Sequence, residues 1–140
     1  MNNPLFLDAS AILRFIGRET GHISDLEVYG EKITDELVEV ECLRTFDRMR
    51  LTGTIDESAL KNRRTALTQL LNASVVLAVD KDIFRRASMA MPVVLRTLDA
   101  IHLTEALGWR EERGGNITIA THDLALARAA KAYGMEVIGA

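Results

Sequence analysis

Four acidic residues that lie far apart in the sequence stand where an apolar run ends or where a helix is expected to begin. They are Asp8, Glu41, Asp99 and Asp123. A carboxylate beside core-forming residues is costly to desolvate unless a partner compensates its charge. Because four carboxylates brought together repel one another, a divalent cation is their natural partner, and oxygen-only ligation suits Mg²⁺ or Mn²⁺. The pattern predicts a metal-dependent enzyme that acts on a phosphate ester.

The composition favours one ordered domain over residues 1–140. The chain has a mass of 15.5 kDa, contains 48 % apolar residues and has only two prolines. Its net charge of −3 argues against a general polyanion binder, but four clustered carboxylates would account for all of that excess, so an RNA substrate stays possible. The single Cys42 excludes an internal disulfide and a Cys-rich zinc site. We expect a cytoplasmic protein without a membrane span or signal peptide.

Strand and helix signals alternate along the chain, which predicts an α/β domain with a mainly parallel sheet. Strands are expected at 5–7, 74–79, 116–120 and 135–138, and helices at 9–16, 23–30, 81–89, 97–107 and 124–133. Two further helices are expected, one capped by Thr34 or Asp35 and running to about Leu51, and one opened by Asp56 or Ser58 and running to Leu71. In such sheets ligands bind at the carboxyl ends of the strands. Asp8 and Asp123 are both expected at that edge.

Three of the acids also have a purely structural explanation. Asp8 and Asp123 are placed to cap the helix that follows each of them, and Asp99 lies in the first turn of its helix, where the helix dipole favours a carboxylate. Asp99 shares its helix face with apolar residues, which favours a functional role. We interpret His102, on the same helix, as a packing histidine that bonds the backbone.

Helix periodicity does not choose between Glu39 and Glu41. The two side chains are two residues apart and point to nearly opposite sides of their helix, so only one can enter a shared site. Apolar residues surround this helix almost completely, and we therefore expect it to be largely buried. They are Leu37, Val38, Val40, Cys42, Leu43 and Phe46.

Four short motifs occur in order along the chain. They are Leu-Asp-Ala-Ser-Ala-Ile-Leu (7–13), Val-Glu-Cys-Leu-Arg (40–44), Leu-Arg-Thr-Leu-Asp-Ala-Ile-His-Leu (95–103) and Thr-His-Asp (121–123). Together with the closing Tyr-Gly-Met-Glu-Val-Ile (133–138), they resemble the successive motifs of PIN domains, and the VapC-type ribonuclease toxins in particular. The resemblance covers essentially the whole chain.

The resemblance implies a role for each matched residue. It makes Asp8, Glu41, Asp99 and Asp123 the metal-site acids, with Glu41 preferred to Glu39. It makes Ser10 and Thr121 the small hydroxyl residues that support them. It further implies an endoribonuclease that uses Mg²⁺ or Mn²⁺ and leaves 5′-phosphate and 3′-hydroxyl ends. The expected partners are a second copy of the chain and a small antitoxin, whose tail covers the acidic site.

Binding of RNA would require positive charge near the acids. Arg44 and Arg48 lie one helical turn apart on the side of Glu41, and Arg96 precedes the helix of Asp99, so these three are the expected phosphate contacts. Other basic groups are interpreted as solvated helix faces. They are Lys61, Arg63 and Arg64, and the pair Arg85 and Arg86.

Two other interpretations are open. A phosphoaspartyl enzyme of the haloacid-dehalogenase type would carry an acid two residues after Asp8, where this chain has Ser10. A receiver-like domain would need a lysine at a late strand end, whereas Lys131 falls within an expected helix. A PIN fold that only binds RNA or protein would be signalled by the loss of one acid, and all four are present.

Overall fold

The centre of the molecule is a five-stranded sheet in which every strand runs parallel to its neighbours, in the order β3-β2-β1-β4-β5. The computed structural model describes residues 3–140. The strands are β1 (Leu5–Leu7), β2 (Lys32–Asp35), β3 (Val75–Leu77), β4 (Thr118–Ala120) and β5 (Glu136–Ile138). An α/β fold with a parallel sheet is therefore confirmed.

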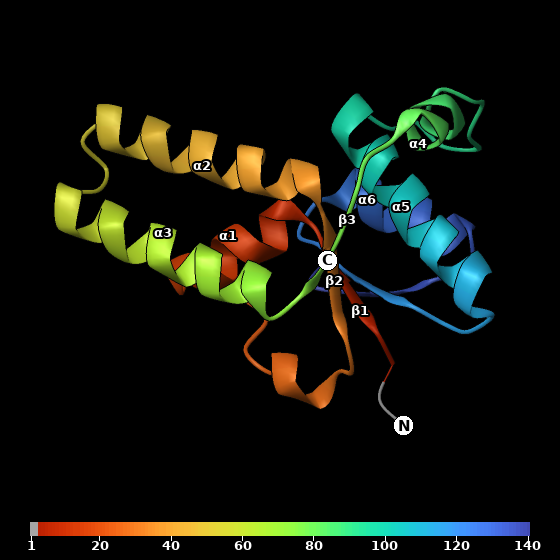
Figure 1. Ribbon diagram of the computed structural model, residues 1–140, viewed down its shortest axis with the longest axis horizontal. Helices are drawn as coiled ribbons and strands as arrows, with labels where there is room; N and C mark the ends of the chain where they lie inside the picture. Colours follow the sequence, from red (N-terminus) through yellow and green to blue (C-terminus); the bar gives the residue numbers. More distant parts are fainter. Residues whose placement is uncertain (1–2) are drawn as a thin grey trace.

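Helices cover both faces of this sheet (Figure 1). On one face lie α1 (Ala9–Gly17), α2 (Glu36–Leu51) and α3 (Glu57–Asn72). On the other lie α5 (Thr97–Arg113) and α6 (Leu124–Ala132), and the short α4 (Lys81–Ala87) packs against α5. None of these helices is long and apolar enough to cross a membrane.

The alternation of side chains along β1 divides the core into two layers. Leu5 and Leu7 point toward α1, α2 and α3, where they join a cluster that includes Phe46. Phe6 points the other way and packs in a cluster with Leu103, under α5 and α6. Because both faces of β1 are covered, all three of its side chains are apolar and buried, as is usual for a strand inside a parallel sheet.

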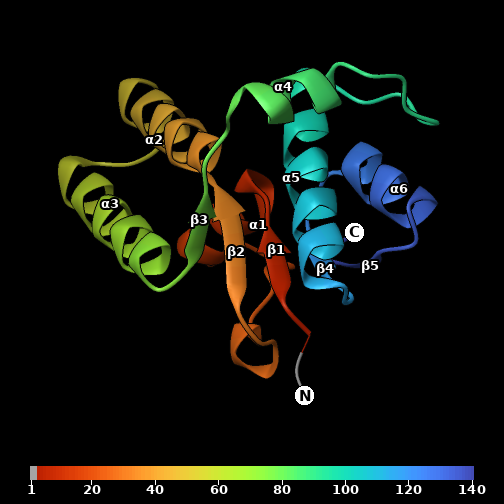
Figure 2. The same ribbon diagram turned by 45° about the vertical axis from the view of Figure 1, so that its right-hand side comes forward.

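The chain builds the sheet outward from β1 in two directions. It first adds β2 and β3 on one side, and then returns to add β4 and β5 on the other. The two halves meet between β1 and β4, and at such a switch point the loops after the strands diverge and leave a crevice. Figure 2 shows the strands pointing toward the end of the molecule at which α1, α2 and α5 begin.

The sequence signals missed one strand and misjudged two helices. β2 was not predicted, because Thr34 and Asp35 look like a helix cap; Asp35 does cap α2, but it also ends a central strand. The helix expected at 97–107 continues to Arg113. The helix expected at 23–30 is a single 3₁₀ turn, Leu26–Val28.

One charged residue of α5 is enclosed by the fold. Glu105 is 4 % exposed, and within the described residues its Oε1 atom has no hydrogen-bond partner. Burial, together with the nearby charges of Asp35 and Asp80, raises the pKa of Glu105 to about 7. The carboxyl group therefore costs stability whenever it is ionised.

This burial predicts a pH-dependent gain in stability for Glu105→Gln. The folded-state pKa of about 7 lies above the ordinary value of 4.5, so the native state binds the extra proton between these limits. The free energy of unfolding of the wild type therefore falls as the pH rises through that window. Urea titration should find Glu105→Gln more stable by about 1–3 kcal/mol at about pH 8, and equal to wild type at about pH 4. A variant that is less stable than wild type at the higher pH would contradict this explanation.

Candidate active site at the sheet switch point

Asp8 anchors the site at the carboxyl end of β1. Its Oδ1 atom accepts the Ala11 N–H (2.8 Å) and so caps α1, and it also accepts the Ser10 hydroxyl (2.7 Å). Its Oδ2 atom accepts the Thr121 hydroxyl (2.5 Å). The side chain is 3 % exposed, and burial raises its pKa despite these hydrogen bonds. Asp8 is thus both the expected cap and a buried acid beside the switch point between β1 and β4.

Ser10 and Thr121 connect the two halves of the sheet at this point. Their hydroxyl oxygens lie 3.3 Å apart, although the residues are 111 positions apart in the sequence. Ser10 Oγ accepts the N–H of His122 (2.9 Å), and Thr121 Oγ1 accepts the N–H of Asp123 (3.0 Å). Both hydroxyls therefore hold the loop after β4 against Asp8, and they fix where that loop places Asp123.

Asp123 and Asp99 lie at the starts of two other helices. Asp123 begins α6, where its Oδ1 atom accepts the Leu126 N–H (2.9 Å). Asp99 lies in the first turn of α5. Burial raises the pKa of Asp99 to about 6, and the charges of Asp123, Asp8 and Glu41 add to that rise. The charges of the other three predicted acids thus all act on Asp99.

Glu41 is held by a chain of charged groups that crosses the core. The His102 Nε2–H group donates to Glu41 Oε1 (2.6 Å), and its Nδ1–H group donates to Asp35 Oδ2 (2.5 Å). Burial alone would lower the pKa of His102, but the hydrogen bonds to Asp35 and Glu41 outweigh it and raise the pKa to about 10. His102 is therefore an imidazolium that bridges two carboxylates, one from the end of β2 and one from α2.

Two expectations about this region were wrong. His102 bonds two carboxylates and not the backbone, because the end of β2 brings Asp35 against its ring. Helix α2 is not largely buried, since Val40 is 58 % exposed. Helix α2 is oriented so that Glu39 is exposed and Glu41 points toward His102. The pairing with Asp35 was missed because no local signal joins residues 67 positions apart.

The three arginines expected to contact phosphate occupy different environments. Arg48 lines a hollow that also contains Ser10. Arg44 is exposed and paired with Asp47 (3.1 Å), and Arg96 is exposed at the start of α5. Arg63, expected on a solvated face, instead lines the same hollow as Arg48. That Arg44, Arg48 and Arg96 contact the substrate stays a prediction.

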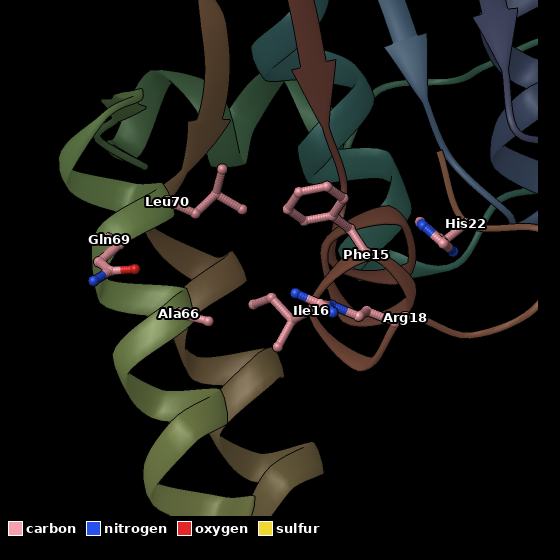
Figure 3. A pocket seen from close by; sticks show the side chains of 7 residues that line it. All are labelled: Phe15, Ile16, Arg18, His22, Ala66, Gln69 and Leu70. Carbon is pink, nitrogen blue, oxygen red and sulfur yellow. The ribbon is translucent and has the colours of Figure 1, made fainter. Parts of the chain in front are cut away.

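A larger hollow than the one lined by Arg48 lies elsewhere. It has a volume of about 640 Å³ and lies between α1 and α3, where Phe15 and Ile16 face Ala66 and Leu70 (Figure 3). None of the four acids lines it. Its walls carry apolar groups with one arginine and one histidine, so it lacks the donors for metal-assisted chemistry.

The comparison with known proteins agrees with this geometry. The PIN-domain family model matches residues 5–132. The chain belongs to the PIN-domain family. It is 34 % identical to Ribonuclease VapC46 of Mycobacterium tuberculosis, over 96 % of this chain and 95 % of that protein, which makes it a VapC-type member. The crystal structure of PAE2754 from Pyrobaculum aerophilum shares its fold, with a TM-score of 0.59 and 17 % identity over 99 % of this chain and 92 % of that one.

PIN-domain nucleases generally use a divalent metal, and the donor set of this PIN domain fits one. Burial and the charges of Asp123, Asp8 and Glu41 raise the pKa of Asp99 and outweigh the opposing charge of His102. A cation beside Asp99 would offset this cost. Within residues 3–140 no three acidic, His or Cys side chains form a ready-made cage. Mg²⁺ does not need such a cage, because it keeps several waters and binds through one or two carboxylates.

The hydrogen-bonded network of Asp35, His102 and Glu41 predicts that substitutions at Asp35 and His102 have strongly coupled effects on stability. His102→Gln alone leaves the fully buried Asp35 without its cation, and should cost about 3–5 kcal/mol in the free energy of unfolding. Adding Asp35→Asn removes the orphaned charge, so the double variant should be more stable than the sum of the two single losses by about 1–3 kcal/mol. Chemical denaturation of the four proteins measures this.

A matched control is His22→Gln, which changes a histidine that bonds only the backbone oxygen of Glu19. It should change stability by no more than about 0.5 kcal/mol. Additive losses from Asp35→Asn and His102→Gln would show that the two groups do not act as a charged pair.

Proposed function

We propose that this PIN domain is an Mg²⁺- or Mn²⁺-dependent endoribonuclease and the toxin of a type II toxin–antitoxin pair. The observation that carries the proposal is the convergence of Asp8, Glu41, Asp99 and Asp123 on the switch point of the sheet. Asp8, Glu41 and Asp123 are held by hydrogen bonds, and the charges of all three act on Asp99. The 34 % identity to a protein named a ribonuclease supports RNA as the substrate.

The carboxylates have different tasks in this proposal. Asp8 and Asp99 are the main metal ligands and Asp123 completes the site. A divalent ion bound there supplies an activated water and neutralises charge on the phosphate. Glu41 has one oxygen committed to His102, so it contributes through its other oxygen, by bonding a water or orienting the nucleophile. Ser10 and Thr121 act only through the acids, by holding Asp8 and the loop of Asp123 in place.

The expected partners follow from the same likeness. A VapC-type toxin has a cognate antitoxin, and an arginine presented by that antitoxin would pair well with the acidic site. We propose in addition that the chain forms a homodimer and acts in the cytoplasm. Membership of the PIN family favours this function over a phosphoaspartyl enzyme, and the presence of all four acids favours it over a binding-only module.

The direct test is cleavage of total cellular RNA by purified protein, with Mn²⁺ or Mg²⁺ and with EDTA as the metal-free control. Wild type should give discrete fragments, and EDTA should abolish them. Asp99→Asn should lower the cleavage rate by at least about a hundredfold, because a ligand and its charge are lost together. The matched control is Asp82→Asn, which removes the same charge from an exposed position on α4 and should leave the rate unchanged. Equal background from wild type and Asp99→Asn would refute the nuclease proposal.

A further inference from the structure

Three arginines from three different helices line one hollow beside the acidic site. Arg14 comes from α1, Arg48 from α2 and Arg63 from α3, and the hollow between them has a volume of about 280 Å³. Arg14 and Arg63 are half-buried, whereas Arg48 is exposed. The Nη1 atom of Arg63 lies 2.9 Å from where a Cβ on Gly17 would stand, which places it at the carboxyl end of α1.

The hollow adjoins the acidic site directly. Ser10 forms part of its wall, and the same Ser10 hydroxyl donates to Asp8 Oδ1 (2.7 Å). One side chain thus touches both the acid that ends β1 and the space lined by the arginines. An RNA strand with one phosphate at the acids would have to leave the site past one of its edges. The edge formed by this hollow is positively charged.

The charge of the hollow is only partly compensated by the residues that line it. Within residues 3–140, none of the three arginines forms an ion pair, whereas Arg44, Arg50, Arg85 and Arg86 all do. Glu19 also lines the hollow, and its single charge leaves an excess of two positive charges. An anion bound in the hollow would reduce the repulsion among these like charges. Guanidinium groups match phosphate in geometry, since their planar N–H groups can bond two oxygens at once.

We propose that this hollow binds a backbone phosphate of the single-stranded RNA adjacent to the scissile phosphate, with Arg14, Arg48 and Arg63 as its ligands. The proposal rests on the proposed ribonuclease function. A volume of about 280 Å³ is small for a whole ligand and fits one unit of a longer chain. An acidic peptide is the other chemistry that could bind here, but the shared wall with Asp8 favours the substrate of that site.

The test is the salt dependence of RNA binding, measured without metal. A fluorescent oligouridylate is titrated with Asp99→Asn protein in EDTA, so that binding is read without cleavage. Adding Arg14→Gln, Arg48→Gln and Arg63→Gln should weaken binding by about tenfold or more. The slope of log K against log salt should fall by about 2, at roughly 0.7 for each phosphate contact of a single strand.

The matched control removes three positive charges elsewhere, by Arg64→Gln, Arg85→Gln and Arg113→Gln. It should keep both the affinity and the slope, because these side chains do not line the hollow. If the triple variant of the hollow fails to fold, Arg48→Gln alone, at an exposed position, should lower the slope by about 0.7.

Three outcomes would overturn the proposal. They are equal binding by the two triple variants, no binding of RNA by the parent protein, and binding of polyglutamate but not RNA through these arginines. Failure of the ribonuclease function is a separate result, because it would be seen as absent cleavage with metal while this assay still reports phosphate contacts.

Discussion

The candidate site depends on one constraint, the electrostatic cost of placing several carboxylates together at one end of the sheet. Burial raises the pKa of Asp8 and of Asp99, and for Asp99 the charges of Asp123, Asp8 and Glu41 add to that rise. Three of the acids have hydrogen-bond partners: backbone N–H groups at the starts of two helices for Asp8 and Asp123, two hydroxyls for Asp8, and one imidazolium for Glu41. The charge of His102 also lowers the pKa of Asp8 and of Asp99, but in both acids the effect of burial is larger. A site that is anchored but electrostatically incomplete is suited to bind a divalent ion, and then to bind phosphate through it.

The parallel sheet explains how distant residues reach this arrangement. Since β1 lies in the centre with β2 and β4 as its neighbours, the carboxyl ends of the three strands are adjacent. These ends supply Asp8, Asp35 and Thr121. Helix α5 then crosses the same edge and contributes Asp99 and His102, one turn apart. The imidazolium of His102 joins Asp35 of β2 to Glu41 of α2. The groups that position Glu41 are therefore also part of the core.

Local sequence signals were sufficient for some of this and not for the rest. A strand that ends in an acid and runs into a helix predicted Asp8 at the right edge, and the same logic placed Asp123. Strand β2 was missed because its last residues also satisfy the rule for a helix cap, and both roles are real. Glu41 could not be separated from Glu39 by periodicity, because the choice depends on how α2 rotates against His102. The roles of Asp35 and Arg63 depend on tertiary contacts that cannot be recognised from the spacing of residues in the sequence.

The central claim is that the four acids bind a divalent cation together, and Mn²⁺ binding followed by electron paramagnetic resonance tests it most directly. Wild type should remove free Mn²⁺ from solution. Asp99→Asn should weaken the affinity by at least about tenfold, and Asp82→Asn should bind like wild type. Equal binding by wild type and Asp99→Asn, or no binding by either, would contradict the account.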